Sequence, residues 1–410
     1  MGGVSMEWKE VTLGEITNLV IDYRGKTPLK LGSSWSDSGY RALSAKNIKT
    51  GQIVAEDSIR FVDEELYRKW MKDEVKRGDI LITSEAPFGQ IYYWDSDEKI
   101  VLSQRLFDVR LNDEVCHKYV FYFMTSHRYQ KDLEGRATGT TVTGLRQPEL
   151  LKSTILLPPL SAQRSIASIL SSLDRKIELN NKINADLEEM AHAIFKNWFV
   201  DFEPFKDGKF VDSELGMIPE GWKVGRLTEI ASYMNGLAMQ KFPPENNEDS
   251  LPVLKIKELG QGFCGTDSDR CSCNIKDECT IHNGDVIFSW SGTLLVDVWC
   301  GGDCGLNQHL FKVTSKDYPK WFYYYWTKHH LQEFIHIAKD KAVTMGHIKR
   351  GHLEEAMVAI PDNDSMEKAH ELFEPILSKM ISLRLESSRL SLLRDTLLPR
   401  LMSGELEVPE

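Results

Sequence analysis

Two long stretches of the chain carry apolar residues at three- and four-residue steps, a spacing that predicts two long amphipathic helices. Residues 161–199 contain no Gly and no Pro, and Ser161 stands where an N-cap is expected. A second stripe over about residues 364–398 predicts a matching helix, in which Pro375 should kink the helix or delay its start. Elsewhere short apolar runs alternate with Gly, Asn, Asp and Ser, which predicts strands and turns.

The two apolar stripes need a partner to bury against, and we expect each helix to pack on the other. Residues expected in that contact are Ile166, Leu173, Asn180, Leu187, Ile194, Ile376, Leu383, Leu390 and Leu397. Met190, Leu372 and Leu393 also fall on the stripes. Asn180 occupies a heptad position otherwise filled by Ile and Leu, where a polar residue can fix the register of two helices. The pattern equally allows a solvated Asn at the edge of the stripe.

The chain contains a duplication, because sequence motifs of the first half recur in the same order in the second half. Trp8, Leu13, Glu15 and Ile16 recur as Trp222, Leu227, Glu229 and Ile230. The run Gly78–Leu81 recurs as Gly284–Ile287, and the aromatic run Phe121–Phe123 as Tyr323–Tyr325. Repeats at a drifting but ordered offset indicate a tandem duplication with loop insertions.

The duplication sets the expected architecture. Each copy would hold a globular part followed by one long helix, and helices at equivalent places in tandem copies would pair antiparallel. At 1.5 Å per residue the first helix would be roughly 58 Å long, more than one small domain needs. We therefore predict an α+β fold in which two pseudo-twofold-related mixed domains are separated by a pair of long antiparallel helices. The predicted boundaries are 1–157 and 201–361 for the domains, and 158–200 and 362–410 for the helices.

Composition and charge narrow the function. The chain has 410 residues, 41% of them hydrophobic and 27% charged, which excludes a disordered protein and a membrane bundle. The net charge of −11 argues against a large phosphate-gripping surface. The first 155 residues, however, contain nearly equal numbers of basic and acidic residues, so one face of that part could still carry a basic groove. The start MGGVSMEWKE predicts no signal peptide, and the seven cysteines indicate cytoplasmic thiols rather than a disulfide framework.

Motifs for catalysis are missing from the sequence. Gly25-Lys26-Thr27 mimics the end of a phosphate-binding loop, but Val20 stands where the first Gly of that motif belongs. No GxGxxG follows a predicted strand. Six cysteines crowd residues 264–304 without a CxxC pair, a poor spacing for zinc, so we expect reduced thiols and assign no metal ligands. A structural zinc is the less favoured alternative that the sequence leaves open. The sequence predicts a binding protein with no catalytic residue and no cofactor of its own.

Polar loops differ most between the two copies, while apolar positions agree. Two domains with the same frame but different polar loops could each recognise a different DNA sequence. Duplex DNA fits such a protein, because its half-sites repeat along one face of the duplex. Arg, Lys, Asn, Gln and Thr in such loops supply phosphate contacts and hydrogen bonds to base edges. The DNA-contacting candidates are Arg24, Lys26, Thr27, Lys46, Asn47, Arg105, Thr140, Thr141, Arg146, Lys241, Lys255, Lys257, Trp290, His309, Lys341, Thr344 and His347. Ser84-Glu85, Gln104 and Gln308 belong to the same loops.

Four motifs carry a resemblance to a known family. They are Ile177–Asn184 running on through Phe195–Phe202, the C-terminal Leu393–Leu406, Leu157–Leu160 with Gln163, and Leu215–Trp222. With them the sequence resembles the specificity subunit of type I restriction-modification systems over essentially its whole length.

The resemblance implies that each globular part is a target-recognition domain for one half of a bipartite DNA site. The helices would set the unspecified spacer and dock two modification subunits, which use S-adenosylmethionine to methylate adenine. Two restriction subunits using ATP and Mg²⁺ would complete the nuclease. Two alternatives remain from the residues alone: a coiled-coil scaffold without a nucleic-acid role, and a stand-alone DNA-binding protein.

Overall fold

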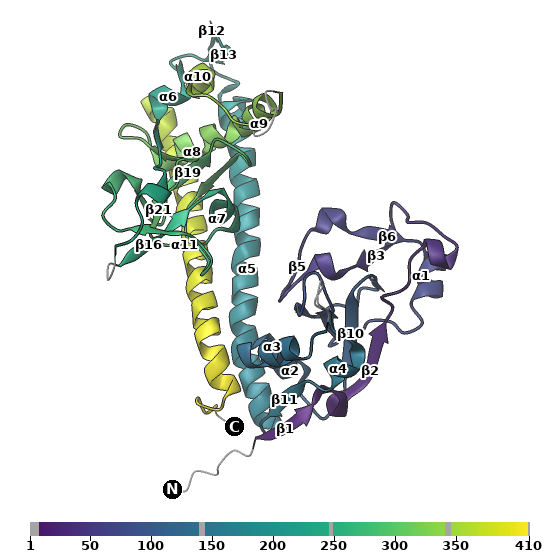
Figure 1. Cartoon of the computed structure of the whole chain (residues 1–410). Coiled ribbons are helices and arrows are strands. Elements are labelled where there is room, and N and C mark those ends of the chain that lie inside the picture. Colours follow the sequence, from purple (N-terminus) through teal and green to yellow (C-terminus); the bar gives the residue numbers. More distant parts are fainter. Residues whose placement is uncertain (1–7, 139–143, 246–248, 341–345, 409–410) are drawn as a thin grey trace. The chain divides into compact units, whose positions relative to one another are not determined.

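The structure is a computed structural model of the chain that describes residues 8–138, 144–245, 249–340 and 346–408. It forms two compact units, one of residues 1–175 with 390–410 and one of residues 176–389. The long helices α5 (Leu160–Phe199) and α11 (Asn363–Met402) each contribute one part to each unit (Figure 1). Within the described residues, no helix is both long enough and apolar enough to cross a lipid bilayer.

The first unit contains a domain that runs from β1 to β11, which we call domain 1. Its strands are β1 (Lys9–Thr12), β2 (Thr17–Asp22), β3 (Tyr40–Leu43), β4 (Ile48–Lys49), β5 (Gln52–Ile53), β6 (Arg60–Val62), β7 (Ile80–Thr83), β8 (Ile91–Tyr93), β9 (Val101–Leu102), β10 (Leu106–Leu111) and β11 (Thr154–Leu157). Its α-helices are α1 (Glu64–Trp70), α2 (His117–Thr125), α3 (His127–Gly135) and α4 (Gln147–Leu151). The main sheet has the antiparallel order β2-β10-β7-β8, and a second sheet has the order β6-β3-β9.

The second unit contains the corresponding domain, which we call domain 2. Its strands are β12 (Phe210–Ser213), β13 (Gly216–Pro219), β14 (Lys223–Arg226), β15 (Ser232–Asn235), β16 (Ser250–Leu254), β17 (Arg270–Ser272), β18 (Thr280–Ile281), β19 (Val286–Ser289), β20 (Leu295–Val298), β21 (Cys304–Leu306), β22 (Leu310–Thr314) and β23 (Met357–Ile360). Its helices are α6 (Leu227–Ile230), α7 (Ile256–Gln261), α8 (Lys320–His329), α9 (Leu331–Asp340) and α10 (Arg350–Glu355).

The two domains share one topology, as the duplication in the sequence predicts. The main sheet of domain 2 has the order β15-β22-β19-β20, which repeats the β2-β10-β7-β8 order of domain 1. A parallel pair recurs as well, β3 with β9 in domain 1 and β16 with β21 in domain 2. In both domains the first and last strands pair antiparallel, β1 with β11 and β14 with β23.

Each main sheet is buried on both faces, which explains why its central strands read as continuous apolar runs. In domain 1, Ile80 and Ile82 face a core with α2, while Leu81 faces a second core with the β6-β3-β9 sheet. In domain 2, Val286 and Phe288 face α8, α5 and α11, while Ile287 faces the smaller sheet. The strongly aromatic helix α8 packs between its sheet and the long helices (Figure 1).

The long helices pair antiparallel inside each unit. In the first unit Arg394 Nη1 lies 2.8 Å from Asp174 Oδ1, and Tyr122 donates to the other oxygen of the same carboxylate at 2.6 Å. In the second unit Asn180 Nδ2 donates to Glu386 Oε2 at 2.9 Å. The residue numbers rise along one helix as they fall along the other, which is the antiparallel arrangement expected from the sequence.

Several details of the helices differ from the sequence-based expectation. The first helix begins at Leu160, so Ser161 lies inside it and is not its N-cap. The second helix begins at Asn363, so Pro375 does not delay its start. Asn180 is fully buried, which excludes the solvated edge position. Met190, Leu372 and Leu393 are 45%, 41% and 45% exposed. For Met190 and Leu372 the reason is that Ala191, Phe195, Phe373 and Leu377 take the buried face near domain 2.

The residues expected between the helices lie at or near that face. Ile166 is 1% exposed in the first unit, and Leu383 is 3% exposed in the second. The other apolar positions of the set are half-buried: Leu173, Leu187, Ile194, Ile376, Leu390 and Leu397.

A buried carboxyl group distinguishes domain 1 from domain 2. Asp108 on β10 is fully buried, and both of its carboxylate oxygens lack a hydrogen-bond partner within the described residues. Burial raises the pKa of Asp108 well above its usual range, and neighbouring Asp79 raises it further. The equivalent position of β22 is Lys312, which pairs with Asp285 at 2.8 Å. In domain 1 the partner of Asp79 is Arg110 instead, at 2.7 Å.

Candidate nucleic-acid interface

The polar loops of domain 1 meet around a depression of about 360 Å³ beside the ends of β7 and β10. Its lining is Arg24, Ser84, Glu85, Gln104, Arg105, Thr138, Gly144, Leu145 and Arg146. Backbone hydrogen bonds tie the loops together, since Ser84 N–H donates to Arg105 O at 2.8 Å and Leu145 N–H donates to Ser84 O at 2.9 Å. Sequence segments some 20 and 60 residues apart therefore form one surface, as the DNA-reading hypothesis requires.

Arg24 is a fixed part of the wall of this depression. Its Nε and Nη2 lie 2.8 Å from the two oxygens of Asp22. The guanidinium also stacks 3.9 Å from the centre of the Phe107 ring, and Nη1 donates to Leu145 O at 3.2 Å. Most N–H donors of Arg24 are already used inside the chain. Arg24 therefore positions the loops and contributes positive charge, but it has few donors left for a ligand.

Arg105 is more accessible than Arg24 and has an unusual backbone conformation. Its backbone φ is +65°, a left-handed conformation that non-glycine residues rarely adopt and that stores strain where it occurs. Its Nε lies 3.0 Å from Glu85 Oε1, and the two side chains are 48% and 33% exposed. Arg105 is thus both accessible and oriented. Gln104 beside it is exposed, and its side chain has no hydrogen-bond partner among the described residues.

Two other candidates of domain 1, Lys46 and Arg146, lie beside the depression or on its lining. Lys46 is exposed and comes next to the depression, because the N–H of adjacent Ala45 donates to Gln104 O at 3.1 Å. Arg146 is exposed on the lining itself. Thr140 and Thr141 lie outside the described residues.

The expectation that Asn47 contacts DNA has to be corrected. Its side chain is 1% exposed, accepts from Ser44 N–H at 3.1 Å and donates to Ala55 O at 3.3 Å. Asn47 is therefore a capping residue that holds the loop after β3. The sequence alone does not show whether a polar loop residue points into solvent or forms hydrogen bonds that close a turn.

Lys26 and Thr27 are also used within the chain. Lys26 Nζ donates to Trp70 O and lies 3.8 Å from the centre of the Tyr23 ring. Burial, followed by repulsion from Lys72, lowers the pKa of Lys26. Thr27 Oγ1 accepts from Lys30 N–H at 3.3 Å. The structure does not bring either residue to the lining of the depression.

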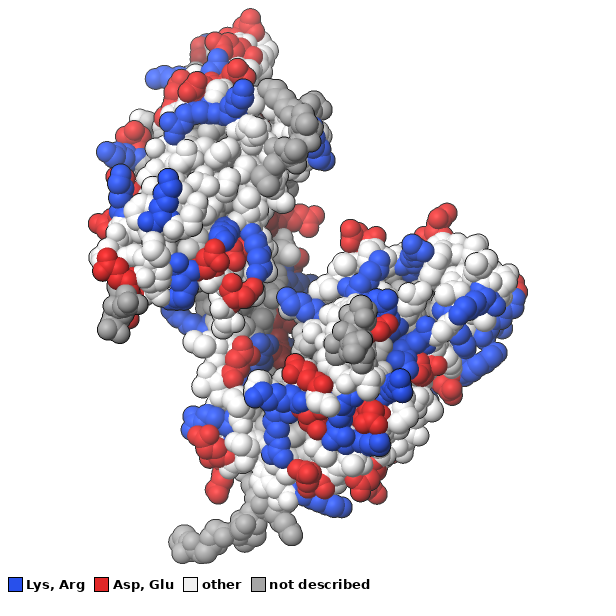
Figure 2. All heavy atoms as spheres, viewed as in Figure 1, with Lys and Arg blue, Asp and Glu red and all other residues white. Residues whose placement is uncertain are grey.

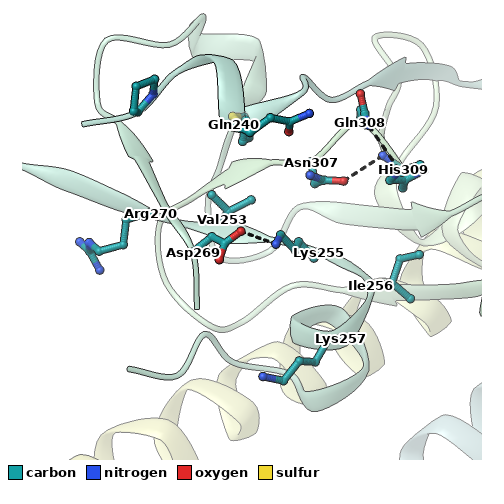
Figure 3. Close-up of a pocket in the computed structure, with 12 residues that line it drawn as sticks. Gln240, Val253, Lys255, Ile256, Lys257, Asp269, Arg270, Asn307, Gln308 and His309 are labelled. Carbon is teal, nitrogen blue, oxygen red and sulfur yellow. Dashed lines mark hydrogen bonds and ion pairs between the residues drawn. The ribbon is translucent and has the colours of Figure 1, made fainter. Parts of the chain in front are cut away.

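Domain 2 has a larger depression of about 700 Å³ (Figure 3). The loop with Gln308 and His309 lines it, as the corresponding loop with Gln104 and Arg105 lines the depression of domain 1, but most of its lining comes from residues around β16, β17 and α7. Its lining is Met239, Gln240, Pro243, Val253, Lys255, Ile256, Lys257, Asp269, Arg270, Asn307, Gln308 and His309. Lys255, Lys257 and His309 are candidates from the sequence, and Lys241 is an exposed neighbour of Gln240. Gln240, Arg270 and Asn307 were missed, because none belongs to a motif that distinguishes a binding loop from an ordinary turn.

The two lysines of this depression have acidic partners. Lys255 forms an ion pair with Asp269, and Lys257 Nζ lies 2.6 Å from Asp267 (Figure 3 shows the first pair). The hydrogen bond to Asp267 raises the pKa of Lys257. Local pairing keeps the net charge small, so this surface favours directional hydrogen bonds over a general attraction to phosphates.

A ring cluster borders the same depression. His309 Nδ1 lies 3.0 Å from Ser291 Oγ, and the Trp290 ring lies 6.1 Å from the His309 ring. Trp290 is also in contact with His347, with ring centres 6.5 Å apart. The candidates Trp290, His309 and His347 therefore form one group. Lys341 and Thr344 lie outside the described residues.

The loops beside the two depressions are held by equivalent hydrogen bonds. Ile348 N–H donates to Trp290 O at 3.0 Å in domain 2, as Leu145 N–H donates to Ser84 O in domain 1. Asn307 N–H donates to Leu254 O at 3.1 Å, as Ser103 N–H donates to Leu43 O at 2.8 Å. The scaffold is the same, and the side chains that it displays are different.

Charge on the visible surface of each unit is mixed. Figure 2 shows Lys and Arg side chains interspersed with Asp and Glu rather than gathered in one uninterrupted basic field. Among the described residues, no group of three or more His, Cys, Asp and Glu side chains is placed to hold a metal ion. Cys271, Cys279, Cys300 and Cys304 are buried thiols.

Known proteins resemble the chain over most of its length. A sequence model of the type I restriction modification DNA specificity domain matches residues 6–189 and 219–383. The chain is 31% identical over 353 residues to the specificity subunit of type I restriction enzyme MjaIX from Methanocaldococcus jannaschii, covering 82% of this chain and 79% of that protein. It is 22% identical over 404 residues to the HindI specificity subunit from Haemophilus influenzae, covering 82% and 88%.

A solved structure agrees with the chain at the level of the fold. The crystal structure of the type I restriction-modification system S subunit from M. genitalium matches with a TM-score of 0.54 and 15% sequence identity, covering 100% of this chain and 98% of that one. The expected fold class, two repeated domains of mixed strands and helices with a long helix between them in the chain, is confirmed.

Proposed function

Since this chain belongs to the family of type I restriction modification DNA specificity domains, we propose that it is the DNA sequence-specificity subunit of a type I restriction-modification complex. Each domain reads one half of a bipartite DNA site through the depression that its polar loops form. The observation that carries this proposal is that each domain of one repeated scaffold has a polar depression, and that the corresponding loops Gln104-Arg105 and Gln308-His309 line both with different side chains.

The chemistry of the depressions suits base edges. Their linings combine guanidinium, amide, imidazole and carboxylate groups, which are the side chains that pair with base edges in the major groove. Because the two linings differ, the two half-sites would differ in sequence, and the whole site would be asymmetric. The paired helices then fix the number of unspecified base pairs between the half-sites.

The partners follow from the same proposal. With a net charge of −11 and acid-paired lysines, this chain needs other subunits to neutralise the DNA backbone. We assign that role to two modification subunits, which carry S-adenosylmethionine and methylate adenine, and expect two restriction subunits that use ATP and Mg²⁺. The chain itself would contribute recognition and no catalytic group, and the complex would work in the cytoplasm where host DNA lies.

The alternatives fit the structure less well. A coiled-coil scaffold explains the helix pair but gives no reason for two polar depressions on a repeated frame. A stand-alone DNA-binding protein would need an uninterrupted basic surface, whereas the ion pairs of Lys255 and Lys257 neutralise the charge next to the larger depression.

Sequencing of host DNA for methyladenine tests the proposal. A strain that carries the gene should show methylation at a bipartite motif with a fixed gap, and deletion of the gene should abolish that methylation. Complementation with the intact gene is the control. Methylation of the same motif in the deleted strain would refute the proposal.

A further inference from the structure

One pair of linked side chains occupies the same place in both domains. Thr83 ends β7 opposite Leu106 at the start of β10, and Ser289 ends β19 opposite Leu310 at the start of β22. Counting two residues onward from each first strand, and one residue back from each second strand, makes Glu85 equivalent to Ser291 and Arg105 equivalent to His309. The Arg105–Glu85 ion pair measures 3.0 Å, and the His309–Ser291 hydrogen bond also measures 3.0 Å.

The geometry is conserved between the domains while the chemistry is exchanged. In domain 1 the pair is a cation with an anion, and in domain 2 it is an imidazole with a hydroxyl. Both pairs line the depression of their domain or border it directly. A position whose placement is kept and whose hydrogen-bonding pattern changes is the place where a repeated reader distinguishes its targets.

Arg105 has the features of a base-reading residue. Glu85 uses Nε of the guanidinium, and the side chain is 48% exposed, so further donors remain accessible to a ligand. A guanidinium fork donates to O6 and N7 of guanine, the commonest specific contact in the major groove. The backbone of Arg105 is held at a φ of +65°, and strain of this kind at a ligand-facing position is retained when the side-chain direction matters.

On this basis, and resting on the function proposed above, we propose that Arg105 reads a guanine in the half-site of domain 1. Glu85 is a positioning residue that orients the guanidinium. The equivalent base pair of the other half-site meets His309 held by Ser291, so the two half-sites differ at this base pair.

The experiment compares variants in the native host, in a strain whose own copy of the gene is deleted. The variants are Arg105→Ala, Arg105→Gly and the double substitution Arg105→His with Glu85→Ser, which gives domain 1 the pair of domain 2. Arg128→Ala is the matched control, because Arg128 forms an exposed ion pair of the same 3.0 Å length with Glu10 on α3 and β1, away from the depression. Methyladenine motifs are read by sequencing, and methylation rates are measured on duplexes with each of the four base pairs, using complex purified through this chain.

We expect the unaltered chain to require a G·C pair at one position of one half-site. Arg105→Ala and Arg105→Gly should accept all four pairs there, a loss of discrimination on the order of 10- to 100-fold. The other half-site and the gap should stay unchanged. The double substitution should lose the preference for G·C, and Arg128→Ala should keep the original motif.

Arg105→Gly separates reading from folding, because glycine adopts a positive φ without strain and should leave the melting temperature unchanged or raise it. Glu85→Gln should weaken discrimination without abolishing the preference for G·C, which a merely structural role of Glu85 would not change. Retention of the same base pair in Arg105→Ala, or loss of all methylation by a stable Arg105→Gly, would overturn the assignment while the proposed function stands. Absence of any bipartite motif with the unaltered chain would overturn both.

Discussion

Asn180 and Glu386 lie 206 positions apart in the sequence and are joined by a hydrogen bond of 2.9 Å between the two long helices. Asn180 is fully buried, and its carbonyl oxygen has no partner among the described residues. Asn184, one turn further along α5, is 8% exposed, and both of its side-chain polar atoms also lack partners there. The helix pair thus carries polar groups inside its contact at a cost in stability. Asn180 stays a candidate for fixing the register of the two helices.

Replacing Asn180 with Leu should stabilise the chain by about 1–2 kcal/mol, because an unsatisfied buried carbonyl is removed while Glu386 remains accessible to water. Thermal unfolding of the purified chain measures the change. Asn184→Leu is the matched control for burial, since it removes polar atoms without touching Glu386. A marked drop in melting temperature for Asn180→Leu alone would mean that the hydrogen bond stabilises the pair more than the buried carbonyl destabilises it.

Lengthening the helix should lengthen the DNA spacer. An insertion of four or seven helical residues after Ile183 extends α5 by roughly 6 or 10 Å, which corresponds to about two or three base pairs of duplex. Both half-sites should keep their sequences, because neither depression is altered. Sequencing of methylated host DNA gives half-sites and gap together. A change in the half-sites at constant gap would show that the helices do not act as a spacer.

Asp108 should make domain 1 sensitive to rising pH. Its pKa is raised in the folded chain, so the folded state retains a proton that the unfolded chain releases near its ordinary pKa. Stability from this group is therefore present at acid pH and lost as pH rises from the unfolded pKa toward the folded one.

Asp108→Asn should raise stability at pH 7.5, by on the order of 1–3 kcal/mol, and have a smaller effect near pH 4. Denaturant unfolding of the two proteins at both pH values checks this. An equal effect at both pH values would contradict the pKa argument. Asp285 of domain 2 is paired with Lys312 and should show no such gain when changed to Asn.

The purified chain alone should bind its DNA site weakly at physiological salt and tightly within the complex. The reason is its net charge of −11 and the acidic partners of the lysines beside the larger depression. Fluorescence anisotropy with a labelled duplex, measured over a range of salt concentrations, tests both states. Tight and specific binding by the isolated chain would show that it neutralises the backbone by itself.

The repeat and the long helices were predictable from sequence, because periodic apolar positions and duplicated motifs survive without structural context. The ends of the helices were less predictable. Ser161 is a residue type that often caps a helix, yet the helix already begins at Leu160. The face of each stripe was misjudged at Met190 and Leu372, since Phe195 and Phe373 pack into the aromatic core of domain 2 and set the rotation of the helices there.

The candidate interface was predictable as loops and not as individual residues. Arg105, Arg146, Lys255, Lys257 and His309 do line the depressions, because polar residues directly after or before buried strands meet at one edge of the sheet. Asn47 and Lys26 have the same residue types and instead close turns or cover an aromatic ring. That choice depends on contacts such as Lys26 with Trp70, 44 residues away, which no local pattern records.

The antiparallel pairing of the first and last strand of each domain has a genetic consequence. Lys9 faces Leu157 in domain 1 and Lys223 faces Ile360 in domain 2, so the chain enters and leaves each domain at neighbouring points. A segment with adjacent ends can be replaced as a cassette without disturbing what precedes or follows it. Recombination between genes at the codons of the long helices would then exchange a complete reader in a single event, and lineages could acquire new half-sites without passing through nonfunctional point mutants.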